Sequence, residues 1–72
     1  MEATKIRVGR LYFVIGNGTV SEKFYHGDVK VLYIEDDTPT RFVCAICSGP
    51  DEGKTRVFYP VHFQMESNSP TL

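Results

Sequence analysis

Hydrophobic residues occur along this chain in short clusters, rich in β-branched and aromatic side chains, that Gly, Pro, Asn and Asp separate. No window shows the sustained helical period of about 3.6 residues, whereas short apolar runs bounded by turn residues are typical of strands. The pattern therefore predicts an all-β chain of five strands. Their expected ranges are 5–15 with a bend at Gly9, 28–35, 41–47, 54–59 and 63–65.

The predicted connections carry residues that suit tight turns. Gly and Asn tolerate positive φ, so Gly16–Gly18 predicts a turn after the first strand, and residues 26–28 predict another. Residues 15–27 as a whole form a predicted long arm. Residues 48–53 predict a hairpin loop. The proline that opens residues 60–62 has no N–H for a ladder, which ends the fourth strand before one predicted 3₁₀ turn.

Five short strands cannot cover one another as two large sheets, so we expect a small, strongly bent barrel. Within its second strand, alternation places Val29, Val31 and Tyr33 on one face. Residues 1–66 are expected to form a single domain. The polar residues 67–72 have the composition of a disordered tail.

Length, composition and charge exclude several classes of protein. A chain of 72 residues buries only about 60–65% of its unfolded surface, which excludes a two-lobed enzyme. Its net charge of -1 argues against a large basic field for nucleic acid, and 42% hydrophobic residues argue against wholesale disorder. No signal-peptide pattern or membrane-length apolar run is present, so we expect a cytoplasmic protein without a membrane partner.

Several motifs follow one another in a familiar order. Leu11-Tyr12 opens the first strand, and residues 24–32 combine an aromatic pair, a Gly-Asp turn and a Val-rich strand. Gly53 closes the hairpin loop, and residues 58–63 combine aromatics, a proline, a turn and a closing aromatic. In order and spacing, residues 9–65 resemble an SH3-like small barrel.

The resemblance implies a ligand face. The partner-binding residues that it implies are Tyr12, Phe42, Tyr59, Pro60 and Phe63. Val14 replaces the second tyrosine of the family's opening motif, Phe42 stands nearest to its tryptophan, and Glu22 is the one acid of the arm. The fold can therefore carry over while the polyproline ligands of SH3 domains do not. Tudor-like and KOW-like modules use the same barrel for other ligands.

Candidate chemical groups favour structural roles. Cys44 and Cys47 form a CxxC, but residues three apart on a strand face opposite sides, so we interpret them as buried or half-buried thiols rather than a zinc or disulfide pair. His26 and His62 lack a nearby nucleophile and are interpreted as solvated turn residues. The acidic residues 35–37 are interpreted as a solubilising turn. We expect no enzyme activity, catalytic residue, metal or cofactor.

A local basic surface is the alternative site. If the third and fourth strands pair, Arg41 approaches Arg56, with Lys54 close by. Together with Phe42 and Tyr59, these residues would meet phosphates and stack bases. This alternative predicts a nucleic-acid-binding barrel of the Tudor or KOW type.

The aromatic residues are too many for the interior of one small barrel. We expect about half of them in the core and several at the surface, where aromatics are typical of protein interfaces. An arm folded over them is the competing interpretation. The nine are Tyr12, Phe13, Phe24, Tyr25, Tyr33, Phe42, Phe58, Tyr59 and Phe63.

The function that the sequence favours is protein binding without catalysis. We expect a small regulator or inhibitor that occupies a surface of a larger protein partner, in the size class of phage-encoded proteins. The nucleic-acid-binding barrel and a homo-oligomer that buries its own aromatics remain open alternatives.

Overall fold

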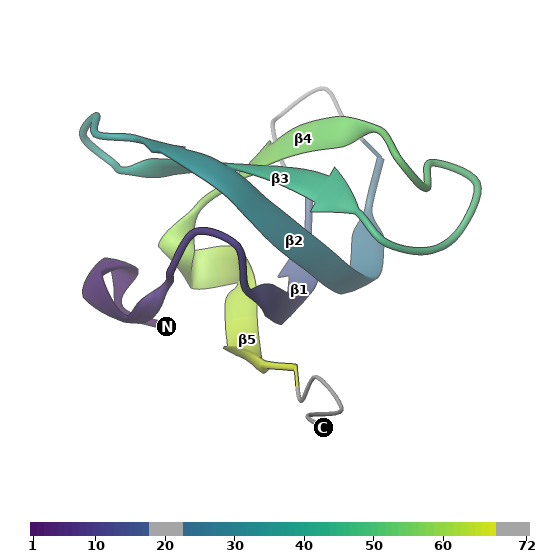
Figure 1. The fold of residues 1–72 in the computed structure, drawn as a ribbon, viewed down its shortest axis with the longest axis horizontal. Coiled ribbons are helices and arrows are strands. Elements are labelled where there is room, and N and C mark those ends of the chain that lie inside the picture. Colours follow the sequence, from purple (N-terminus) through teal and green to yellow (C-terminus); the bar gives the residue numbers. More distant parts are fainter. Residues whose placement is uncertain (18–22, 68–72) are drawn as a thin grey trace.

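Five antiparallel strands and two short 3₁₀ helices make up the regular secondary structure that a computed structural model describes for residues 1–17 and 23–67. In chain order the elements are η1 (Ala3–Lys5), β1 (Leu11–Gly16), β2 (Tyr25–Glu35), β3 (Arg41–Ile46), β4 (Thr55–Phe58), η2 (Pro60–His62) and β5 (Phe63–Glu66) (Figure 1). In the same residues, no helix has the length and apolar character that crossing a membrane requires.

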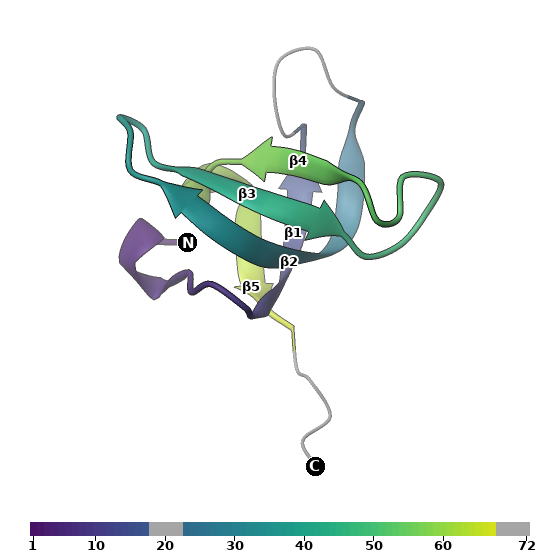
Figure 2. The ribbon, with the colours of Figure 1, turned by 45° about the horizontal axis from the view of Figure 1, so that its top comes forward.

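The strands form one sheet in the order β4-β3-β2-β1-β5. The long strand β2 pairs with β1 from Tyr25 to Lys30 and with β3 from Val29 to Glu35. Figure 2 shows β1 and β5 running across the direction of β3 and β4, so the sheet is strongly bent around β2. The predicted all-β class with five strands is confirmed. Among the described residues no ladder joins β4 to β5, so the sheet is open.

The second half of β2 departs from simple alternation. The register with β3 shifts between Val31 and Tyr33, which marks a bulge at Leu32. Val29 and Val31 are fully buried, whereas Tyr33 is 53% exposed. The prediction that these three side chains share one face is therefore wrong for Tyr33, because the extra residue turns the strand before Tyr33 is reached.

The first strand is shorter than predicted. Residues 3–5 form η1, and Gly9 adopts φ of +87°, a left-handed conformation that ends the extended segment before β1. The segment nevertheless packs on the sheet, since Ile6 is buried in the core and the Arg7 N–H donates to the Tyr12 hydroxyl at 2.7 Å.

The predicted turn at residues 26–28 is strand. His26, Gly27 and Asp28 pair with Ile15, Val14 and Phe13 of β1, so β2 begins three residues earlier than the sequence suggests. The sequence predicts a turn here because Gly and Asp are typical turn residues, whereas Gly27 adopts its positive φ inside the ladder. The predicted arm is shorter in consequence, and its residues 18–22 lie outside the described residues.

The last part of the chain follows the prediction closely. β3, β4, η2 and β5 lie within two residues of their expected bounds. Ser67, assigned to the tail, is instead fixed to the sheet: its N–H donates to the Leu11 carbonyl at 2.9 Å, and its hydroxyl donates to Asp28 Oδ1 at 2.6 Å. The other tail residues, 68–72, lie outside the described residues.

Aromatic rings make up much of the core. Tyr12 and Phe42 both contact Phe63 edge-on, with ring centroids 5.5 and 5.3 Å apart. Four of the nine aromatics are buried, Phe24 and Tyr33 are exposed, and the other three are half-buried. The predicted division between core and surface is confirmed. The buried cluster is Ile6, Tyr12, Val14, Val29, Val31, Phe42, Cys44, Ile46, Phe58 and Phe63.

Candidate binding pocket at the ends of β3 and β4

Three of the predicted partner-binding residues lie in the core. Tyr12, Phe42 and Phe63 are at most 2% exposed, so their assignment to a ligand face is wrong. Phe42 points inward because it lies opposite Phe58 in the hairpin, and the N-terminal segment covers Tyr12. Tyr59 and Pro60 are half-buried and keep part of their surface available to a partner.

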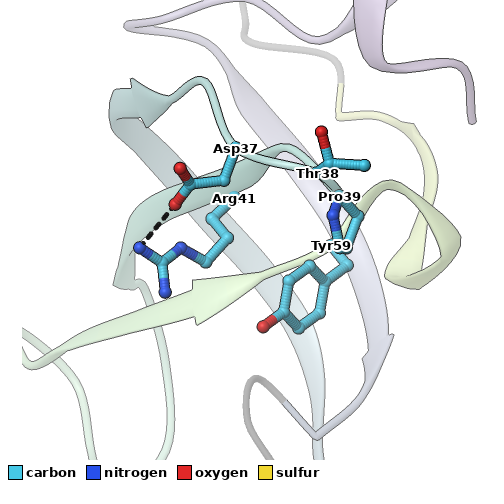
Figure 3. Close-up of a pocket in the computed structure, with 5 residues that line it drawn as sticks. All are labelled: Asp37, Thr38, Pro39, Arg41 and Tyr59. Atoms are coloured by element: carbon cyan, nitrogen blue, oxygen red, sulfur yellow. Dashed lines mark ion pairs between the residues drawn. The ribbon is translucent and has the colours of Figure 1, made fainter.

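Tyr59 lines a pocket of about 290 Å³ together with Asp37, Thr38, Pro39 and Arg41. Figure 3 shows Asp37 and Arg41 on one side of this pocket and Pro39 and Tyr59 on the other. The connection between β2 and β3 supplies Asp37, Thr38 and Pro39. The hairpin supplies Arg41 and Tyr59, which follow from its register, as described next.

Arg41 and Tyr59 are neighbours that turn away from the core. Phe42 lies opposite Phe58, and both point inward, so the residues beside them face outward. The same row continues along the sheet, where Val43 lies opposite both Tyr33 and Val57 and is itself buried, at 7% exposure. We call these three residues, with Arg41 and Tyr59, the outer face.

Two carboxylates hold the Arg41 guanidinium in place. Its Nη2 lies 2.9 Å from Glu35 Oε1 and 2.7 Å from Asp37 Oδ2. Its Nε–H is buried and has no acceptor among the described residues. With Asp36, the loop carries three acids against one guanidinium, which leaves this end of the outer face negative. The acidic turn therefore does more than solubilise the chain, since it also fixes one wall of the pocket.

The structure separates Arg41 from the other two predicted nucleic-acid residues, Lys54 and Arg56. Arg56 lies opposite Cys44 on the inner side of the hairpin and is 8% exposed, whereas Arg41 faces outward. Arg56 forms an ion pair with Asp51 and donates to the Lys23 carbonyl at 2.7 Å. Lys54 Nζ lies 3.7 Å from Asp51 as well. The expectation that Arg41 approaches Arg56 is wrong, because the two side chains project from opposite faces.

His62 is built into the fold rather than solvated. Its ring is half-buried, and its Nδ1 accepts a hydrogen bond from the Tyr59 N–H at 3.1 Å. Burial lowers the pKa of the His62 ring below its ordinary value. His26 is exposed, but it belongs to β2 rather than to a turn.

The cysteines occupy the places that the sequence predicts, one buried and one half-buried, and both are free thiols. Burial, with a smaller contribution from Cys47, raises the pKa of the Cys44 thiol to about 12. Burial also raises the pKa of Cys47, followed in size by the nearby carboxylates of Asp28 and Glu52. In the part of the chain that the structure describes, no three His, Cys, Asp or Glu residues are grouped so as to hold a metal ion.

Sequence reasoning missed the β2–β3 connection as part of a site. Asp37 was interpreted only as part of a solubilising turn, and the place of Asp37, Thr38 and Pro39 beside Tyr59 depends on the pairing of β3 with β4. Alternation placed Tyr33 on the same face as Val29 and Val31, and the bulge at Leu32 puts it on the outer face instead. The one local signal was the joint presence of Arg41 and Tyr59 at the two ends of a predicted hairpin.

Comparison with known proteins adds nothing to the assignment of this pocket, which rests on the geometry described above. No protein-family model matches the chain, and neither a curated protein nor a solved structure does so.

Proposed function

We propose that this chain is a small non-enzymatic protein-binding module of SH3-like barrel architecture, which regulates or inhibits a larger partner by occupying part of its surface. The architecture is supported by the order of the elements, with η2 between β4 and β5 and with β2 shared by both halves of a bent sheet. Topology of this kind supports a fold, and the site has to support the function.

The pocket beside Tyr59 is the observation that carries the function. It opens at the end of the outer face, where Tyr33 and Val57 flank Val43. Tyrosines and aliphatic side chains surrounded by charged residues are typical of protein interfaces, since the rings supply apolar area and the hydroxyls remain paired with water or a partner.

The charge around the pocket suggests what the partner presents. Pro39 and the Tyr59 ring form an apolar wall, and on the other side the two carboxylates of Glu35 and Asp37 outnumber the Arg41 guanidinium. A partner segment with an apolar side chain next to a Lys or Arg would complement both walls. An acidic segment would be repelled, which makes the sign of the partner's charge a direct test.

The experiment is a comparison of three immobilised chains: wild type, Tyr59→Ala and Phe24→Ala. Phe24 is 63% exposed and precedes β2 at the end opposite the pocket, so it is a matched surface aromatic. We expect one protein from the native cell to be retained by wild type and Phe24→Ala and lost by Tyr59→Ala. Mass spectrometry identifies it, and circular dichroism checks that each variant is folded.

Three results would contradict the proposal. The first is equal retention by Tyr59→Ala, which would place the interface elsewhere. The second is a single-stranded oligonucleotide whose mobility the chain changes at low salt but not at high salt, because steep salt dependence indicates phosphate binding. The third is a homo-oligomer in light scattering that Tyr59→Ala dissociates, because the outer face would then be covered by a second copy.

A further inference from the structure

His62 connects the pocket to the end of β1 through opposite edges of its ring. On one edge, Nδ1 accepts the Tyr59 N–H at 3.1 Å. On the other, the ring lies so close to Gly16 that a Cβ there would be 2.7 Å from Cδ2. The Phe58 ring packs against the same ring in a T-shaped arrangement, with centroids 5.8 Å apart. The ring therefore has little freedom to rotate.

Tyr59 is held by His62 at both of its main-chain polar groups. The Tyr59 N–H donates to the ring, and the Tyr59 carbonyl accepts the His62 N–H at 2.9 Å. The two rings are also in contact, with centroids 5.9 Å apart. Since Tyr59 forms one wall of the pocket, the position of that wall depends on the state of His62.

Nδ1 can accept this hydrogen bond only while it carries no proton. The neutral ring must hold its proton on Nε2, and a second proton on Nδ1 would set two donors against each other. The groups around the ring do not favour that charge. Gly16 and Phe58 are uncharged, Tyr59 adds a phenol, and Gln64 donates its amide to the His62 carbonyl at 3.1 Å. The Met1 ammonium group, which donates to the Pro60 and Phe63 carbonyls at 3.2 Å each, is itself a cation.

We propose that His62 is a proton-sensitive positioning residue, whose neutral ring holds Tyr59 in the pocket wall and whose protonation releases it. The lowered pKa of His62, caused by burial, agrees with a ring that the fold keeps neutral. The consequence for partner binding rests on the proposed function: loss of one hydrogen bond of ordinary net strength would weaken binding about fivefold. The movement of Tyr59 itself does not depend on any partner.

The test is an NMR pH titration of the free, isotope-labelled chain. We expect the Tyr59 amide resonance to shift with the same midpoint as the His62 ring protons, at a pH below the ordinary histidine value of 6.5. The amides of Asp37 and Arg41, across the pocket, should follow with that midpoint. A Tyr59 amide that stays constant while the His62 ring titrates would overturn the proposal.

His62→Asn is the decisive variant, because its carboxamide oxygen can take the place of Nδ1 as an acceptor but does not titrate. We expect its Tyr59 amide resonance to show no transition with pH, whereas the matched control His26→Asn retains the transition. A transition that persists in His62→Asn would overturn the assignment to His62. If His62→Asn fails to fold, the wild-type and His26→Asn titrations decide. Partner capture at low and high pH is measured separately, so a failed capture counts against the proposed function and leaves the NMR result standing.

Discussion

Replacing Phe42 by alanine should unfold the protein rather than merely disable a binding face. The ring is fully buried, lies opposite Phe58 and contacts Phe63 edge-on. A phenylalanine buries at least about 150 Å², which at about 25 cal/mol per Å² corresponds to about 4 kcal/mol. Measured costs of Phe→Ala in cores are about 3–5 kcal/mol. A single small core of this size supplies about 3–5 kcal/mol in total, so Phe42→Ala should be largely unfolded at 25 °C.

Urea unfolding followed by circular dichroism and tyrosine fluorescence measures this, with Tyr59→Ala as the matched aromatic control. Tyr59 is half-buried, so its replacement should cost about 1 kcal/mol and leave a folded chain. Phe42→Leu should remain folded with a lower urea midpoint and an unchanged slope, which gives a measurable intermediate case. A Phe42→Ala midpoint equal to that of wild type would refute the burial of this ring and restore its place on a ligand face.

Three further outcomes follow from the geometry. Gly16→Ala should lower the free energy of unfolding by about 1–3 kcal/mol. The loss should exceed that of Gly9→Ala, because both positions have positive φ but only Gly16 lies against His62. Paired urea titrations of the two variants measure the difference. The free energy of unfolding should be constant above about pH 7.5. It should fall as pH drops through 6.5, because the unfolded chain then binds the His62 proton before the folded chain does, and level off below the lowered pKa of His62 in the folded chain. Unfolding midpoints measured across pH test this, and a flat profile would contradict it. A thiol reagent at mildly alkaline pH should modify the half-buried Cys47 in the folded chain and the buried Cys44 only after unfolding. Mass spectrometry of the early products identifies the modified cysteine, and modification of Cys44 first would contradict this.

Much of the fold was predictable because strands and turns have local causes. The Val-rich run in β2, the apolar run in β3 and the proline that opens η2 each carry their signal within a few residues. The bulge at Leu32 has no such signal, since it depends on how β2 bends between two partners. For this reason alternation placed Tyr33 on the wrong side.

The site was predictable only in part. Tyr59 was assigned to a ligand face from the resemblance to SH3-like barrels, and it is half-buried beside the pocket. The choice of inward or outward face for Phe42 and Arg41 needed the register of the hairpin, and the burial of Tyr12 needed the N-terminal segment that packs over it. Both are long-range facts that no local pattern contains.

Because β2 pairs with both β1 and β3, its central residues tolerate fewer changes than the connection that follows it. Val29 and Lys30 have ladder partners on both sides, so an insertion near them would reverse inside and outside in two pairings at once. The connection that carries Asp37 and Pro39 lies beyond the last pair of β2 and β3, and changes there leave both registers intact. An evolving lineage, or a protein engineer, could therefore exchange the residues that this connection supplies to both sides of the pocket, and with them the preferred partner, without redesigning the sheet that holds it.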